Sequence, residues 1–256
     1  MGYGTIRYAV EAGVATLTLD RQDRLNALDS AMRREVAEAV GRAGTEARVL
    51  VLTGAGRAFC TGQDLGAAAG GFDVERTLRD EYEPMLRAIH DCPVPTIAAV
   101  NGVAAGAGAS LALACDVAIA AESAVFIQAF ARIGLIPDAG GTYWLPRQVG
   151  FARAMGAALF AEPTPARQAE AWGMIWQATA DEAFDAVVAA RARQLAEGPT
   201  AAYRLIKQAL RGGLAHDLDA QLALEARLQA EAGATRDFRE AIAAFLEKRP
   251  PRFEGR

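Results

Sequence analysis

A run of ten residues, most of them glycine or alanine, restricts the fold and chemistry of this chain more than any other stretch. Residues 101–110 read Asn-Gly-Val-Ala-Ala-Gly-Ala-Gly-Ala-Ser and follow an apolar segment, residues 96–100, that is typical of a buried strand. Because most of these side chains are hydrogen or methyl, a ligand or another chain can approach the backbone closely. The run also opens a predicted helix that ends near Cys115, so its first N–H groups are unpaired and carry partial positive charge. Taken alone, the run is equally well explained by close packing between helix and strand.

A second glycine-containing loop follows another predicted strand, residues 49–53. Residues 58–65 read Ala-Phe-Cys-Thr-Gly-Gln-Asp-Leu. The preceding glycines, Gly54 and Gly56, do not complete a dinucleotide-binding fingerprint, because Phe59 stands where the third small residue is needed. No Gly-Lys-Ser or Gly-Lys-Thr follows any glycine loop, which excludes a phosphate-binding nucleotide loop of that type. The two loops therefore offer backbone groups rather than a nucleotide motif.

The alternation of short strands with helices predicts an α/β fold. Ser30 is a candidate cap for the first helix, and Pro84 interrupts the second. From about Thr142 the pattern becomes nearly all helical. The predicted strands are residues 5–10, 14–20, 49–53, 96–100, 117–119 and 124–127, and the predicted helices include residues 30–42 and 74–90.

The composition narrows the classes of function. The chain has 27 basic and 31 acidic side chains and a pI near 5.4, which does not predict a nucleic-acid-binding surface. No stretch approaches the roughly 18–20 uninterrupted apolar residues that a membrane span needs, and the first residues do not resemble a secretory signal. The three cysteines, Cys60, Cys92 and Cys115, are widely separated, and neither they nor His90 and His216 have metal-ligand spacing. We expect a cytoplasmic protein without a metal, a membrane or a nucleic-acid partner.

One C-terminal helix carries two apolar stripes. Leu218 and Leu222 form the first stripe, and Leu224 and Leu228 form the second. A helix that is apolar on more than one side needs two burial partners, and the second can be another subunit.

The two loops, together with residues 136–142 (Ile-Pro-Asp-Ala-Gly-Gly-Thr), resemble the signature of the crotonase (enoyl-CoA hydratase/isomerase) superfamily. The resemblance covers nearly the whole chain, from the first hairpin to Pro250. It implies a crotonase-like spiral of ββα units over residues 1–195, which holds the CoA site, and a helical trimerisation region over residues 196–256. Within the superfamily, this chain most resembles the ring-1,2-epoxyphenylacetyl-CoA isomerases. The segments that carry this resemblance are residues 59–65, 101–113, 134–138, 154–156 and 172–177.

The resemblance implies that the thioester carbonyl oxygen accepts hydrogen bonds from the backbone N–H groups of Gln63 and Ala107. Removing a proton next to a thioester builds negative charge on this oxygen, and each preorganised donor there can be worth roughly 3–4 kcal/mol. Because these donors are backbone groups, we expect the side-chain identity at positions 63 and 107 to matter less than the shape of the loops.

The acid/base assignment depends on what this sequence lacks. Hydratases of the superfamily use two glutamates, which align with Ser110 and Phe130, so hydration by that mechanism is not expected. The acidic candidates nearby are Asp116, Glu122 and Asp138. Asp138 matches the position of the catalytic aspartate in isomerases and dehalogenases of the superfamily. A single carboxylate that takes a proton at one carbon and returns it elsewhere suits isomerisation, which consumes no water.

Asp138 also fits a simpler role, because aspartate is a preferred helix cap. Catalysis requires instead a mostly apolar pocket, which raises the basicity of the carboxylate in the bound complex. The candidate wall residues, each of which also fits the core, are Phe130, Ile133, Leu135 and Tyr143.

Coenzyme A is part of the expected substrate, so no separate cofactor is expected. The resemblance implies that Arg24, and Lys248 with Phe245, meet the nucleotide end of CoA. The C-terminal pair can come from an adjacent subunit of a homotrimer or a dimer of trimers, and Asp64 holds the loop shape. The full set of implied CoA contacts is Arg24, Ala58, Phe59, Gln63, Asp64, Leu65, Phe245 and Lys248.

The expected reaction is the rearrangement of an acyl-CoA. The resemblance implies conversion of 2-(1,2-epoxy-1,2-dihydrophenyl)acetyl-CoA to its ring-expanded oxepin isomer, or relocation of a double bond in an unsaturated acyl-CoA. One alternative is an enoyl-CoA hydratase with an unusual water-activating group. Another is a non-catalytic acyl-CoA-binding or RNA-binding member of the fold, although the acidic pI argues against RNA.

Overall fold

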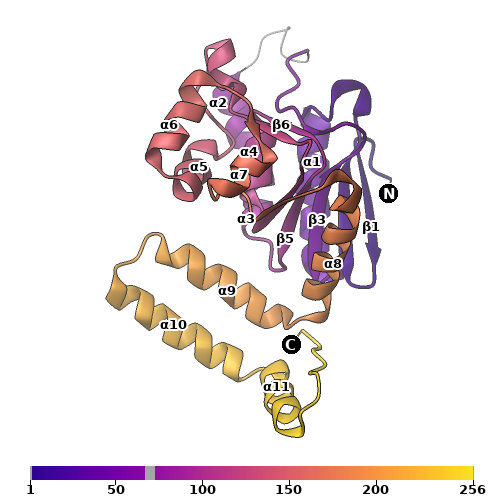
Figure 1. Cartoon of the computed structure of the whole chain (residues 1–256), viewed down its shortest axis with the longest axis vertical. Coiled ribbons are helices and arrows are strands. Elements are labelled where there is room, and N and C mark those ends of the chain that lie inside the picture. The colour runs from indigo at the N-terminus through magenta and orange to yellow at the C-terminus, as the bar shows by residue number, and fades with distance from the viewer. Residues whose placement is uncertain (1, 67–72, 256) are drawn as a thin grey trace.

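The computed structural model describes residues 2–66 and 73–255 and is built around two sheets (Figure 1). The larger sheet has the strand order β1-β2-β3-β5-β7-β10. β1 and β2 form an antiparallel hairpin, and the other neighbours pair in parallel. These strands are β1 (Ile6–Glu11), β2 (Val14–Leu19), β3 (Val49–Gly54), β5 (Thr96–Val100), β7 (Val117–Ala121) and β10 (Gln177–Thr179).

Three strands of the smaller sheet each directly follow a strand of the larger sheet along the chain. β4 (Ala58–Cys60), β6 (Val103–Ala105) and β8 (Val125–Ile127) follow β3, β5 and β7, and β9 (Thr164–Pro165) completes the order β4-β6-β8-β9. The chain therefore steps from one sheet to the other and then into a helical segment, three times in succession. This is the expected spiral of ββα units, and the predicted fold class is confirmed.

Helices cover both faces of the larger sheet. In β3, Leu50 and Leu52 belong to the core on the α1 side, whereas Val49 and Val51 pack with α8. Successive side chains of a strand point to opposite faces, so this continuously apolar strand needs cover on both. The helices before the C-terminal region are α1 (Ser30–Glu46), α2 (Val74–Thr77), α3 (Glu83–His90), α4 (Ala107–Ala114), α5 (Gly141–Val149), α6 (Phe151–Phe160), α7 (Ala166–Ala171) and α8 (Phe184–Glu197).

One local prediction was wrong. The cap of α1 is Asp29 rather than Ser30, because the Asp29 carboxylate accepts a hydrogen bond from the first helical turn at 2.8 Å. The predicted helix over residues 74–90 is confirmed, and within it a π-helical turn, Leu78–Tyr82, separates α2 from α3. Pro84 lies in the first turn of α3 and has no N–H, so the hydrogen-bond register changes just before it.

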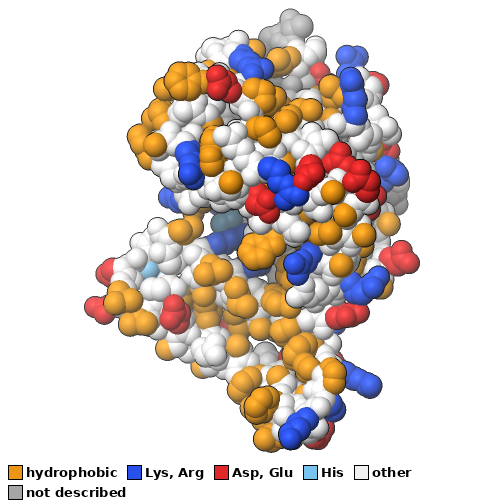
Figure 2. All heavy atoms as spheres, viewed as in Figure 1, with side chains coloured by type: hydrophobic (Ala, Val, Ile, Leu, Met, Phe, Trp, Pro, Cys, Tyr) orange, Lys and Arg blue, Asp and Glu red, His pale blue; other side chains and the backbone are white. Residues whose placement is uncertain are grey.

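The C-terminal region lies beside the two sheets as a separate helical layer, over which hydrophobic side chains gather (Figures 1 and 2). The Asp116 carboxylate attaches it to the core, pairing with Nζ of Lys207 at 2.7 Å and Nη2 of Arg211 at 2.8 Å. Within the described residues, no helix has both the length and the apolar character to cross a membrane. The helices of this layer are α9 (Thr200–Gly213), α10 (Leu218–Gly233) and α11 (Arg236–Glu247).

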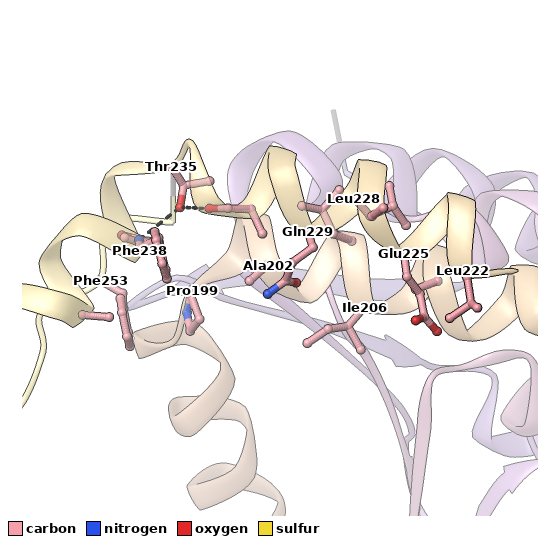
Figure 3. Close-up of a pocket in the computed structure, with 16 residues that line it drawn as sticks. Pro199, Ala202, Ile206, Leu222, Glu225, Leu228, Gln229, Thr235, Phe238 and Phe253 are labelled. Carbon is pink, nitrogen blue, oxygen red and sulfur yellow. Dashed lines mark hydrogen bonds between the residues drawn. The ribbon is translucent and has the colours of Figure 1, made fainter. Parts of the chain in front are cut away.

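A groove of about 650 Å³ runs between these three helices (Figure 3). Ile206, Leu222 and Phe238 line it, and about half of each residue's surface is exposed. Leu228, on the second stripe of α10, is only 3% exposed, whereas Leu218 is 72% exposed. One apolar stripe of α10 is thus buried within the chain, and the other faces outward.

Candidate active site

The two glycine loops lie against each other, backbone on backbone. They follow neighbouring strands, since β4 and β6 pair in parallel. Gly62 has φ +89° and Gly106 has φ +53°, values in the left-handed region that favours glycine. A Cβ atom on Gly62 would lie 3.1 Å from the backbone N of Ala107, and one on Gly108 would lie 2.1 Å from the carbonyl oxygen of Cys60. The small residues are therefore required for the loops to meet.

This contact leaves two backbone N–H groups free. Leu28 bridges to Gln63 in parallel: its N–H donates to the Gly62 oxygen at 2.7 Å, and its oxygen accepts from the Asp64 N–H at 3.1 Å. The bridge uses the groups on either side of Gln63 and turns the N–H of Gln63 away. Ala107 is the first residue of α4, where a helical N–H has no intrahelical acceptor. Within the described part of the chain, neither N–H has an acceptor, and both residues line one cavity.

That cavity has a volume of about 260 Å³. Three of the four predicted wall residues line it, whereas Tyr143 lines an adjacent groove of about 660 Å³. Asp138 is the one carboxylate among the described residues that line the cavity. The larger apolar side chains of the cavity wall are Leu65, Val74, Leu78, Phe130, Ile133 and Leu135.

The carboxyl group of Asp138 borders both the cavity and the adjacent groove. Its burial raises the pKa of Asp138 from 3.8 to about 6. Its Oδ1 atom is buried and has no hydrogen-bond partner among the described residues. The N-cap of α5 is Gly140, and no side chain caps that helix end, so the alternative role of Asp138 as a helix cap is not met. A partly buried carboxyl with one unpartnered oxygen and a pKa of about 6 is suited to taking up and returning a proton.

The two positions that the family resemblance aligns with the hydratase glutamates, Ser110 and Phe130, hold no acid. Ser110 is fully buried, and its hydroxyl donates a hydrogen bond to the main-chain oxygen of Asp138 at 3.0 Å. Phe130 is 6% exposed and forms part of the cavity wall. Ser110 thus holds the backbone of the acidic residue, and neither side chain can activate a water molecule in the way a carboxylate does.

The other acidic candidates lie outside the cavity. Asp116 is the carboxylate that attaches α9 to the core. Glu122 pairs with Arg167 on the surface. Neither residue lines the cavity, which leaves Asp138 as the candidate for proton transfer.

Some of the predicted CoA contacts lie at or beside the cavity. Leu65 lines it and is 54% exposed. Ala58 and Phe59 are buried in β4, so their side chains belong to the core. Asp64 pairs with Arg21 at 2.9 Å, an interaction that supports the shape of the loop.

The remaining predicted contacts are not brought to the cavity within one chain. Arg24 pairs with Asp23 at 3.6 Å on the exposed surface and does not line the cavity. Phe245 is 82% exposed and lies on α11, and Lys248 directly follows that helix. Figure 1 shows α11 at the tip of the C-terminal layer and α4 within the part of the molecule that contains the sheets.

Sequence analysis missed a buried polar cluster behind the first loop. The Gln63 side chain accepts hydrogen bonds from Arg33 and from Tyr82, each at 2.8 Å. Arg33 is 2% exposed although it is charged. The spacing in the sequence could have indicated this burial, because Arg33 lies on the buried face of α1 with Val36 and Val40.

Comparisons with known proteins identify the family of this chain. The sequence pattern of the enoyl-CoA hydratase/isomerase family matches residues 9–256. A probable enoyl-CoA hydratase of Rhodobacter capsulatus is 61% identical over 257 residues, which cover 100% of both chains. The 1,2-epoxyphenylacetyl-CoA isomerase of Escherichia coli K12 is 48% identical over 258 residues, which cover 96% of this chain and 97% of the relative.

Solved structures share the whole fold. An enoyl-CoA hydratase from Bacillus anthracis superposes with a TM-score of 0.92 at 32% identity, covering 99% of this chain and 100% of the other. The spiral core, the two facing loops and the full-length relatives agree with one another. The chain therefore belongs to the enoyl-CoA hydratase/isomerase family, the crotonase superfamily of CoA-thioester enzymes.

Proposed function

We propose that this enzyme isomerises an acyl-CoA thioester, with Asp138 as the proton-transfer group and the N–H groups of Gln63 and Ala107 as the oxyanion donors. The observation that carries the proposal is the setting of Asp138. It is the one carboxylate among the described residues of the cavity wall, and one of its oxygens has no partner. Ser110 and Phe130 stand where a hydratase would place its glutamates.

The proposed chemistry follows from this arrangement. The two N–H groups hold the thioester oxygen while the carbon next to the thioester loses a proton to Asp138. The electron pair left on that carbon moves into the carbonyl, and the donors stabilise the resulting negative charge. Asp138 then returns the proton to another carbon, so no atom is gained or lost. The apolar wall favours this step, because it disfavours a lasting charge on the carboxylate.

The proposed substrate is 2-(1,2-epoxy-1,2-dihydrophenyl)acetyl-CoA, in the breakdown of phenylacetate. The Escherichia coli relative named 1,2-epoxyphenylacetyl-CoA isomerase supports this choice, since 48% identity extends over nearly the whole chain. The apolar wall that includes Phe130 suits an apolar ring. Relocation of a double bond in an unsaturated acyl-CoA would use the same groups, and neither reaction requires a cofactor beyond the CoA of the substrate.

The test compares the wild type with Asp138→Asn on the epoxide and on unsaturated CoA esters, followed by mass spectrometry and ultraviolet absorbance. We expect a product of unchanged mass and a loss of about 10²- to 10⁴-fold in kcat for the variant. Wild-type kcat/KM should fall below pH of about 6, where Asp138 becomes protonated. Asp219→Asn, at an exposed position of α10, is the matched control. Full isomerase activity in Asp138→Asn would refute the mechanism.

A second candidate is hydration of an enoyl-CoA. The Rhodobacter capsulatus relative named as a probable enoyl-CoA hydratase, at 61% identity, supports it. The same experiment separates the two reactions, because hydration of crotonyl-CoA adds the mass of one water, whereas isomerisation leaves the mass unchanged.

We also propose that the enzyme acts as a homotrimer, or a dimer of trimers, in the cytoplasm. The exposed apolar groove of the C-terminal layer and the distance of Phe245 and Lys248 from the cavity of their own chain support an assembly in which a neighbour supplies these CoA contacts. The three cysteines are unpaired and buried, in keeping with a reducing compartment.

A further inference from the structure

We propose that the side chain of Gln63, with Arg33 and Tyr82 as positioning residues, sets the direction of the Gln63 N–H towards the thioester oxygen. This inference rests on the proposed function of that N–H as an oxyanion donor. It departs from the expectation, drawn from the sequence, that the side chain at position 63 matters little.

Each polar group of the Gln63 side chain has a protein partner. Its Oε1 accepts from Nη1 of Arg33 at 2.8 Å and from the hydroxyl of Tyr82 at 2.8 Å. Its Nε2 donates to the main-chain oxygen of Asp64 at 3.1 Å. Two donors from different elements and one local acceptor leave the side chain a single rotamer, which restrains the backbone that carries it.

Arg33 joins this side chain to the strand bridge beneath it. The same Nη1 donates to the main-chain oxygen of Leu28 at 2.9 Å, and Leu28 is the bridge partner of Gln63. Nε and Nη2 of Arg33 donate to one oxygen of Glu81 at 3.0 Å and 2.6 Å. A buried guanidinium group is stable only while its partners remain in place, so the arrangement resists displacement of any one of them.

The cluster also reaches the cavity wall through Tyr82. The guanidinium of Arg33 lies 4.7 Å from the centre of the Tyr82 ring. Tyr82 ends the π-helical turn, and both it and Leu78, at the start of that turn, line the cavity. Local π-helical geometry is often found at functional sites. One set of hydrogen bonds therefore fixes both the oxyanion donor and the wall that faces the substrate.

This geometry has a kinetic consequence. An oxyanion donor contributes most when its N–H already points at the position the charge will occupy. Loss of the Oε1 acceptor would release the loop from Arg33 and Tyr82 while keeping the N–H itself. Such a misplacement should lower kcat by about 10- to 100-fold and alter KM less, because the ground-state thioester binds mainly through CoA.

The test uses Gln63→Met, which keeps the length of the side chain but removes the acceptor, and Tyr82→Phe, which removes one donor but keeps the ring. Each is mixed with para-dimethylaminocinnamoyl-CoA, whose absorption moves to longer wavelength when hydrogen bonds draw charge onto the thioester oxygen. We expect the wild type to show this red shift, Gln63→Met to lose half of it or more, and Tyr82→Phe to lose a smaller part. Gln194→Met, at a glutamine bonded to Arg191 on the exposed face of α8, is the matched control.

Melting temperatures of all variants separate positioning from stability. A lower melting temperature in both variants with the full red shift and unchanged kcat would overturn the inference, since the cluster would then be merely structural. A wild type that binds the probe without any red shift would overturn the proposed oxyanion site itself, and the inference with it. If Gln63→Met does not fold, the red shift and kcat of Tyr82→Phe decide the question.

Discussion

Asp138 lies where burial makes its carboxylate a stronger base and also makes its charge costly. Its folded-state pKa of about 6 lies above the ordinary 3.8, so between these values the folded chain binds a proton that the unfolded chain does not. The stability that this proton provides is present below pH of about 3.8 and is lost as pH rises through about 6. At neutral pH the enzyme therefore gives up stability in order to hold a reactive carboxylate at this site.

This cost can be measured directly. Asp138→Asn should raise the free energy of unfolding by about 1–3 kcal/mol at pH 8 and leave it unchanged at pH 3, where both side chains are neutral. Urea denaturation at the two pH values tests this, and Asp219→Asn should change stability by less than about 0.5 kcal/mol at either pH. Destabilisation of Asp138→Asn at pH 8 would mean that the carboxylate is held by bonds rather than penalised by burial.

At the scale of elements, the first turn of α4 depends on small residues. All of its residues are buried, and it packs against β4 so closely that the Gly108 position lies against the Cys60 carbonyl. Glycine normally weakens a helix interior, by about 1 kcal/mol relative to alanine. Here contact between helix and strand outweighs that preference, because the two loops must meet for both N–H groups to face one cavity.

Gly108→Ala should therefore destabilise the protein, although alanine has a higher helix propensity than glycine. We expect it to lower the free energy of unfolding by about 1–3 kcal/mol and to reduce kcat further by separating the loops. Gly41→Ala is the matched control, since Gly41 lies inside α1 with no atom within 4 Å of the added methyl group, and it should stabilise by about 0.5–1 kcal/mol. Thermal unfolding and steady-state kinetics of both variants provide the comparison. Equal gains in stability would show that α4 has room for a methyl group.

At the scale of the whole molecule, the C-terminal layer is joined to the core by polar contacts and leaves much apolar surface uncovered. Asp116 holds α9 through Lys207 and Arg211, while the groove between α9, α10 and α11 exposes about half of Ile206 and of Leu222. A monomer with this much uncovered apolar surface would be prone to associate. The proposed trimer would cover the groove and bring the last helix of one chain to the CoA of another.

Ile206→Glu tests this assembly. Light scattering should give the wild type a mass about three or six times the 27.0 kDa of one chain, and the variant a mass near that of one chain. The variant should also show at least about a tenfold higher KM for acyl-CoA, because the neighbour's CoA contacts are lost. Val10→Glu, at an exposed apolar position of β1, should leave mass and KM unchanged. A wild type that is monomeric and fully active would contradict the proposal.

What the sequence by itself determined is local. The strands follow from apolar periodicity, and the two loops follow from runs of glycine and alanine that admit close backbone contact. Asp138 was predicted from the family resemblance, which places the catalytic aspartate at this position and aligns the hydratase glutamates with Ser110 and Phe130. Such features depend on neighbours in the chain, which is why most strands and the fold class were predicted. The cap at Asp29 and the π-helical turn were missed.

Only the tertiary structure decided how far each residue is buried and what it contacts. Gln63 meets Tyr82, 19 residues away, and Arg33, 30 residues away, and no sequence pattern records either contact. The raised pKa of Asp138 and its unpartnered oxygen likewise arise from the packing of distant segments. Backbone chemistry can be anticipated from residue type, but desolvation and hydrogen-bond partners exist only once the chain has folded, because they depend on residues that the sequence keeps apart.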